Sequence, residues 1–335
     1  MTERSSLPDE TAAAEYAAGR RAVGLLDRSD CGLIEVTGRD RAAFLHAMLS
    51  NDVKALGPGQ GCAAGFLDIH GKVQGLLVVW ALDDRLLVLT PPSQAEKTVQ
   101  GLDRYLFSEK AVFRNASGER ALFMLAGPGA PALAARVTGV AVPDRPWSHV
   151  AATLAGAAVR LVRGSGETGE PEVWVDAPAG DGPRVRQALG EGGARPIGAA
   201  AFESLRIEAG TPRFGQDVDD TVLLPELSCE DLVSNTKGCY LGQEVVVRIR
   251  DRGHVNRHLR GLVLEGNAVP APGSPILAGG TEIGRVTSAT WSFGLRRPIA
   301  LGFVKRQYAE PGTTVAVSAG GRLIPATVSA LPFPR

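Results

Sequence analysis

A single thiol stands between a cation, two glycines and an amide-carboxylate pair in the segment Lys237-Gly238-Cys239-Tyr240-Leu241-Gly242-Gln243-Glu244. Gly238 and Gly242 free the backbone for tight turns or close approach, and the ammonium of Lys237 favours the thiolate form of Cys239. If Gly242 opens a helix, the free N–H groups of its first turn add to that effect. A thiolate serves as a nucleophile, a redox centre or a soft-metal ligand. The segment therefore predicts a working site at Cys239 and Lys237, the alternative being a buried thiol at a turn.

This octapeptide resembles the signature of the YgfZ family, folate-binding relatives of the glycine-cleavage aminomethyltransferase that serve iron-sulfur cluster assembly or repair. A second segment, LRIEAG at 205–210, is similar to a motif of the wider superfamily, as is Phe214-Gly215-Gln216-Asp217 after it. Stretches within 37–53 and 283–333 resemble the opening and the closing barrel of the aminomethyltransferase group. The resemblance implies a GcvT-like α+β fold: mixed helix and sheet lobes around a folate cleft, with a small C-terminal β-barrel.

The LRIEAG motif supplies the pterin contact that this resemblance implies. In the aminomethyltransferases the glutamate of the motif recognises the pterin, a role that maps to Glu208, and a carboxylate accepts two parallel hydrogen bonds from an amino-pyrimidine edge. Arg206 lies on the same predicted helix, and Phe214 is expected to line the pocket. The alternative for Glu208 is a solvated or salt-bridged helix residue. The expected cofactor is tetrahydrofolate or another reduced folate.

The sequence departs from the transferases at Gln74-Gly75. The transferases have a paired aspartate before the corresponding apolar strand, and one member of that pair serves the methylene transfer. An aspartate-phenylalanine pair also stands in them where this chain has Cys239 and Tyr240. The scaffold thus resembles the transferase, while the residues predict a protein that is not an aminomethyltransferase.

A run of basic residues follows the octapeptide. Five arginines, 248, 250, 252, 257 and 260, stand with His254 and His258, and Asp251 alone opposes them. Solvated surface is the usual explanation, but in a neutral chain this local excess is a candidate seat for the glutamyl carboxylates of folate or for RNA phosphate. We favour the small anion, with Arg250 and Arg257 as contacts. The two histidines do not predict a metal site, because no carboxylate completes it.

Composition limits the function further. The 335 residues include 36 basic and 36 acidic side chains, which gives no strong signal for nucleic acid or for an anionic membrane. The longest apolar run, 76–82, is far shorter than the ~20 residues of a membrane helix, and the N-terminus lacks the apolar stretch of a secretory signal. The four cysteines are widely separated, which predicts reduced thiols rather than a disulfide framework. A cytoplasmic protein is the expectation.

The hydrophobic pattern alternates helix and sheet. Helices are predicted over 10–26, 39–49, 94–106, 182–189 and 199–209, and strands over 32–36, 76–82, 86–89, 121–125, 157–162 and 172–175. From Leu259 onward Gly, Pro and β-branched residues recur at short intervals, which indicates strands at 259–264, 283–287, 299–304 and 314–317. We expect a folate-binding domain over 1–255, two lobes joined near the proline-rich 141–147, and a barrel over 256–335.

These observations predict a folate-binding protein that supports iron-sulfur cluster assembly or repair through a reactive cysteine. Its expected partners are folate and iron-sulfur client or assembly proteins. The alternative is a folate-dependent aminomethyltransferase or demethylase enzyme.

Overall fold

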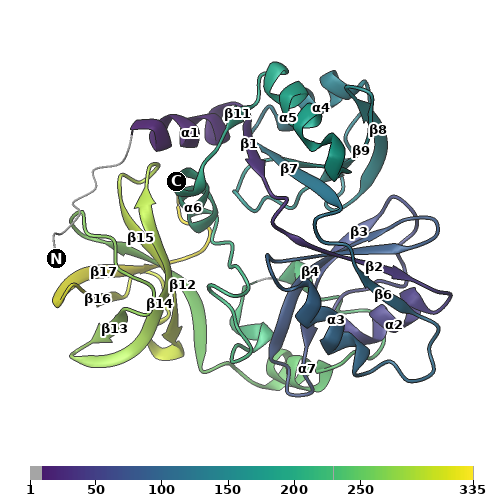
Figure 1. Cartoon of the computed structure of the whole chain (residues 1–335). Coiled ribbons are helices and arrows are strands. Elements are labelled where there is room, and N and C mark those ends of the chain that lie inside the picture. Colours follow the sequence, from purple (N-terminus) through teal and green to yellow (C-terminus); the bar gives the residue numbers. More distant parts are fainter. Residues whose placement is uncertain (1–9, 229, 335) are drawn as a thin grey trace.

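The computed structural model describes residues 10–228 and 230–334. Figure 1 shows three lobes: a barrel at the left, a sheet with helices at the upper right and a second sheet with helices at the lower right. The predicted α+β fold with a C-terminal barrel is confirmed.

The six-stranded lobe has the strand order β11-β1-β7-β10-β9-β8. Two helices, α4 and α5, pack on the sheet, and Val173, Val175 and Leu189 are among the residues buried between them. The elements are β1 (Gly24–Asp27), β7 (Arg120–Ala126), α4 (Ala130–Thr138), β8 (His149–Leu154), β9 (Ala157–Arg163), β10 (Glu172–Pro178), α5 (Gly182–Glu191) and β11 (Arg195–Pro196).

The five-stranded lobe has the order β3-β4-β5-β2-β6, with every pair antiparallel. Its alternating strands bury one face under α2 and α3, as period-two patterning dictates. The elements are β2 (Gly32–Thr37), α2 (Arg41–Met48), β3 (Gly61–Leu67), β4 (Val73–Ala81), β5 (Leu86–Thr90), α3 (Ala95–Asp103) and β6 (Val112–Asn115).

The C-terminal lobe is a closed barrel of order β12-β15-β14-β13-β16-β17. Closure leaves no free sheet edge, and a compact apolar cluster that includes Leu262, Ile276 and Val317 fills the interior. The strands are β12 (Arg257–Leu264), β13 (Pro275–Ala278), β14 (Thr281–Ser292), β15 (Arg297–Lys305), β16 (Thr314–Ala319) and β17 (Arg322–Ser329).

The lobes meet over one shared apolar cluster, which contains Trp80, Met124 and Leu301 from the three lobes in turn. Helices α1 (Glu10–Arg21) and α6 (Ala199–Glu208) pack on each other, and α6 also packs on β14. A long connection after α6 runs through the centre to α7 (Gln243–Arg252), with 3-10 turns η2 (Leu224–Glu226) and η3 (Glu230–Leu232). Segments from the whole chain therefore line the centre of the molecule.

The lobe joint differs from the expected one. The chain crosses between sheets after β1 and again between β6 and β7, whereas 141–147 connects α4 to β8 inside the six-stranded lobe. The strand that follows this segment, β8, does touch the other lobe: the backbone N–H of its first residue, His149, donates to the carbonyl of Gly59 at 2.8 Å. Proline-rich composition marks a loop, but it does not show which strands the flanking segments pair with.

The first helix also ends earlier than predicted, at Arg21, and Gly24–Asp27 is a strand. These four residues pair with β7, where Gly24 faces Ala126. Residues 24–27 continue the apolar pattern of the helix, so the pattern does not mark the end of the helix. Their strand partner, β7, lies about a hundred residues later in the chain, and the local sequence carries no sign of that pairing.

Candidate functional site

The octapeptide lies over the C-terminal end of helix α2. The ammonium of Lys237 donates to the carbonyl oxygens of His46, of Leu49 at 2.5 Å and of Asn51 at 3.0 Å. His46 lies in the last turn of α2, whose carbonyls carry the negative end of the helix dipole, where a cation is stabilising, and Leu49 and Asn51 follow the end of the helix. Burial lowers the pKa of Lys237 to about 8. The hydrogen bonds of the Lys237 ammonium are thus made at the end of α2 and not with the neighbouring thiol of Cys239.

Gly242 explains part of the motif sterically. Its φ is +78°, and a Cβ there would lie 2.4 Å from the carbonyl oxygen of Asp68. Helix α7 starts at the next residue, so the helix that Gly242 was expected to open does form. The side-chain oxygen of Gln243 accepts a hydrogen bond from the backbone N–H of Tyr240 at 3.2 Å, and Glu244 is exposed in the first turn.

Cys239 is exposed, and so is Gly238, where a Cβ would meet open space. Tyr240 beside them is buried, and its hydroxyl has no hydrogen-bond partner within the part of the chain that the structure describes. Burial raises the pKa of the Cys31 and Cys62 thiols to about 11 and about 12. Cys239 is thus the accessible thiol of these three, and Cys229 lies outside the described residues.

Glu208 is almost fully enclosed by protein donors. One carboxylate oxygen accepts from the Tyr16 hydroxyl at 2.7 Å and from Arg20 at 2.6 Å. The other accepts from the hydroxyls of Ser204 and Ser292 and from the backbone N–H of Gly294. These bonds join α1, α6 and the end of β14. Because a carboxylate offers about four lone-pair sites, this network fills the Glu208 carboxylate with protein donors, and the pterin contact predicted there stays a prediction.

Arg206 is also buried, and its guanidinium is hydrogen-bonded to groups of the protein. Its guanidinium donates to Asp217 at 2.7 Å, to Glu203 at 2.5 Å and to the hydroxyl of Ser288 at 2.8 Å. It joins α6 to the connection after it and to the barrel. The predicted cofactor contact at Arg206 stays a prediction, while the geometry gives this side chain to the lobe junction.

A cavity of ≈ 210 Å³ lies at the centre, between the two sheet lobes and the connection after α6. Strand β4 contributes Leu76 and Val78, and Asp231 and Leu232 come from η3. Three aromatic rings line it: Trp147, Trp174 and Phe214. Phe214 is thus one of the rings that line this cavity, and its predicted contact with a cofactor stays a prediction.

The polar side chains that line this cavity differ in whether they have a hydrogen-bond partner. Arg28 donates to Glu167 at 2.7 Å, and its guanidinium lies 5.0 Å from the ring centroid of Trp174. The indole N–H of Trp174 is buried and has no partner among residues 10–228 and 230–334. Trp147 holds a left-handed φ of 64°, a conformation that costs energy for a bulky residue. Aromatic rings, a charged pair and a residue in a strained conformation thus line one cavity, a combination typical of a binding site.

Gln74 lies near the start of β4, where a β-bulge opposite Phe66 and Leu67 leaves it without a partner on β3. Leu76 and Val78, further along the strand, line the cavity, whereas Gln74 and Gly75 are not among its lining residues. An amide stands where the resemblance leads us to expect a carboxylate.

The two predicted tail contacts are not brought together. Arg257 donates to Glu226 at 2.9 Å and lies 4.6 Å from the ring centroid of Phe303. Arg250 is exposed on α7 and pairs with Asp251 at 2.7 Å. They line two different hollows of the surface.

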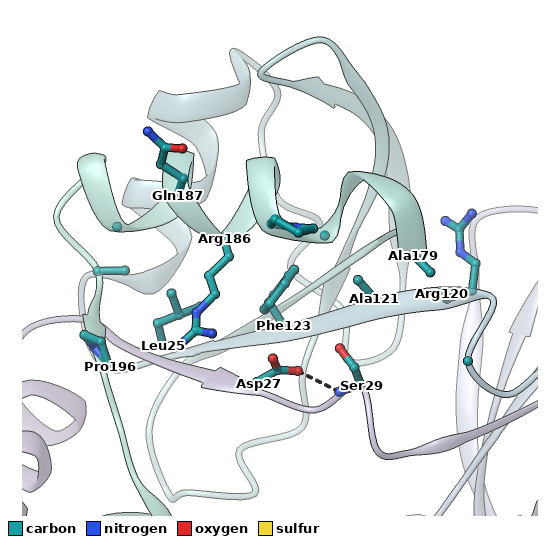
Figure 2. A pocket seen from close by; sticks show the side chains of 15 residues that line it. Leu25, Asp27, Ser29, Arg120, Ala121, Phe123, Ala179, Arg186, Gln187 and Pro196 are labelled. Carbon is teal, nitrogen blue, oxygen red and sulfur yellow. Dashed lines mark hydrogen bonds between the residues drawn. The ribbon is translucent and has the colours of Figure 1, made fainter.

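Figure 2 shows a larger hollow of ≈ 630 Å³ on the six-stranded lobe, between α5 and strands β1 and β7. Leu25 and Phe123 form its apolar floor, and Arg186 reaches from α5 toward Asp27. Both charged side chains are exposed, and the predicted site residues lie elsewhere. This hollow is separate from the candidate site.

Sequence reasoning missed Arg28, Glu167, Trp147 and Trp174. A weak signal existed for two of them, because Glu167 follows the Gly164-Ser165-Gly166 loop and Trp174 follows on the next strand. No helix within the described ranges is long and apolar enough to cross a bilayer.

Comparisons with known proteins agree with this architecture. Residues 4–237 match the GCVT N-terminal domain, and residues 257–334 match the glycine cleavage T-protein C-terminal barrel domain. An aminomethyltransferase of Streptomyces avermitilis is 33% identical over 96% of this chain and 89% of its own length. A putative chloroplastic transferase of Arabidopsis thaliana is 29% identical over 93% and 71%.

The glycine cleavage aminomethyltransferase of Bartonella henselae has the same fold in its crystal structure. Its TM-score is 0.86 at 24% identity, and the match covers 96% of this chain and 89% of that one. The chain belongs to the glycine cleavage T-protein family.

Proposed function

We propose that the protein binds a reduced folate, with the ring in the central cavity. The observation that carries the proposal is a central cavity lined by three aromatic rings, those of Trp147, Trp174 and Phe214, one of which has a buried indole N–H without a described partner. A pteridine offers flat faces for those rings and acceptor atoms for a buried donor. Asp231 and Glu167 also line the cavity and offer carboxylates for its amino group, and one oxygen of Glu167 already accepts from Arg28 at 2.7 Å.

Two activities fit such a ligand. Aminomethyl transfer has the support of the comparisons, since full-length relatives carry that name. The amide of Gln74 on β4, where the resemblance leads us to expect a carboxylate, speaks against that chemistry, because an amide does not accept a proton as a carboxylate does.

The second candidate is support of iron-sulfur cluster assembly or repair, as a member of the YgfZ type. One observation favours it: Cys239 is an exposed thiol beside a glycine with open space around it. An exposed thiol can approach a client protein or a metal ion in transfer. In this function the iron-sulfur cluster is a transferred group and not a resident cofactor. The proposed folate site is the same as for aminomethyl transfer.

Two measurements test these proposals. Calorimetry with 5-formyl-tetrahydrofolate tests folate binding, and the absence of binding overturns it. Turnover of an aminomethylated carrier protein then separates the activities. Robust turnover establishes the transferase, whereas loss of several iron-sulfur enzyme activities in a deletion strain, restored by the wild-type gene, establishes the second candidate.

A further inference from the structure

A buried carboxylate, that of Glu172, stands at the start of strand β10. The residue is 1% exposed and has no ion-pair partner in the described parts of the chain, 10–228 and 230–334. Its two oxygens instead accept hydrogen bonds from the loop that precedes the strand. One accepts from the backbone N–H of Thr168 at 2.7 Å and from the Thr168 hydroxyl at 2.8 Å, and the other from the backbone N–H of Gly166 at 3.2 Å. The loop between β9 and β10 is therefore folded around this carboxylate.

Two glycines of the loop allow it to come so close to β10. A Cβ at Gly164 would lie 2.6 Å from the Cβ of Glu172, which is far inside van der Waals contact. Gly166, whose N–H donates to Glu172, has a φ of +92°, in the region that favours glycine. The Gly164-Ser165-Gly166 sequence thus permits the approach on which these three hydrogen bonds depend.

The same loop presents Glu167 to the central cavity. Glu167 stands between the two residues that donate to Glu172, and it lines the cavity, whereas Glu172 is not among the lining residues. The Glu167 carboxylate accepts from Arg28 at 2.7 Å, and its carbonyl accepts from the hydroxyl of Thr211 at 2.9 Å. Glu172 therefore holds the backbone on both sides of Glu167 without touching the cavity itself.

The charge of Glu172 suits this role. An ionised carboxylate is an acceptor at both oxygens, so it matches three converging donors, and hydrogen bonds to a charged acceptor are the stronger kind. Burial, with the charge of Glu167, raises the pKa of Glu172 to about 7. At pH 8 the group is thus mainly ionised and able to accept all three hydrogen bonds.

We propose that Glu172 is a positioning residue for the folate site: it holds the loop 164–168 so that Glu167 presents its carboxylate to the amino group of the pteridine. The inference rests on the proposed folate function. Hydrogen bonds weaken steeply when their geometry is lost, so a shift of the loop should weaken ligand binding even though Glu172 does not contact the ligand.

The experiment is a double-mutant cycle on affinity for 5-formyl-tetrahydrofolate, measured by calorimetry at pH 8. Glu172→Gln should weaken binding about fivefold, because the amide offers one acceptor atom in place of two. Glu167→Gln should weaken binding about tenfold. The double variant should bind as weakly as Glu167→Gln alone, since Glu172 acts through Glu167. Glu191→Gln, at an exposed position of α5 in the same lobe, is the matched control and should bind like the wild type.

Two further measurements report on the loop directly. Thr168→Val keeps the Glu172 carboxylate but removes its hydroxyl donor, so binding should weaken about twofold. Amide hydrogen exchange at Gly166 and Thr168 should become faster in Glu172→Gln, even without folate, because both N–H groups lose part of their acceptor. A structural role elsewhere in the lobe would not produce this local change.

Other outcomes would overturn the inference. Wild-type affinity in a folded Glu172→Gln variant, or unchanged exchange at both amides, would refute the positioning role and leave folate binding intact. Additive losses, about fiftyfold in the double variant, would show that Glu172 acts independently of Glu167. If Glu172→Gln does not fold, unchanged binding by Thr168→Val decides against the proposal. Absence of binding by the wild type would instead overturn the proposed function, and this inference with it.

Discussion

Two polar regions near the centre of this molecule differ in how their hydrogen bonds are used. Around Arg206 and Glu208, charged side chains are buried and bonded to partners from α1, the connection after α6 and the barrel. On the cavity wall, the Trp174 indole N–H is buried with no partner among the described residues. The first region is complete without a ligand, and the second is not.

The difference teaches how to separate structural from ligand-binding polar groups. A buried charge pair is costly to break, because one partner is left uncompensated. A buried donor with no partner already costs about 1–3 kcal/mol, and a ligand that accepts its hydrogen bond recovers that energy. A buried polar group whose hydrogen bonds the protein does not fill points to the ligand site better than its charge or its place in a motif does.

The largest effect is expected for Arg206→Met. It leaves Asp217, whose side chain is 0% exposed, without its cation. We expect the free energy of unfolding to fall by about 3–5 kcal/mol, measured by urea denaturation. The control is Arg213→Met, which removes a partly buried partner of Glu203 at 3.4 Å and should cost under ~1 kcal/mol. Equal losses in the two variants would contradict a buried network.

Glu208→Gln should have the next largest effect. The amide keeps the size of the side chain, but its NH2 group faces donors from Tyr16 and Arg20. We expect a loss of ~1.5–3 kcal/mol in unfolding free energy, with folate affinity of the folded protein nearly unchanged. Unchanged stability with weakened folate binding would reverse the comparison and restore Glu208 as the pterin contact that the sequence predicted.

The sequence predicted what depends on local pattern. Barrel strands such as Arg297–Lys305 were found because β-branched residues recur between glycines and prolines. It did not predict that Glu208 is saturated, because Tyr16 and Ser292 are 192 and 84 residues away along the chain. The same limit hid the cavity wall, where Arg28 meets Glu167 across 139 residues. A motif identifies which residues matter, and only the fold shows which of them still have free hydrogen-bonding capacity.

A smaller effect is expected on binding. Trp174→Phe removes the unpartnered N–H and keeps an aromatic ring, so folate affinity should fall by about 1 kcal/mol, or roughly fivefold. Trp80→Phe is the matched control, since Trp80 also has a buried indole N–H without a described partner but does not line the cavity. Calorimetry should show weaker binding for Trp174→Phe alone. A similar loss in both variants would mean that ring packing, not the donor, decides affinity.

The smallest change in folding or binding energy is expected for Cys239→Ser, because this thiol is exposed. Stability should change by less than ~0.5 kcal/mol and folate affinity should stay the same, yet the variant should fail to restore iron-sulfur enzymes in a deletion strain. The buried thiols of Cys31 and Cys62, with pKa values raised to about 11 and about 12, should react slowly with iodoacetamide. Their serine variants should restore the enzymes wherever the protein still folds. Full restoration by Cys239→Ser would leave the octapeptide as the segment that joins α2 to α7, and would favour aminomethyl transfer as the activity.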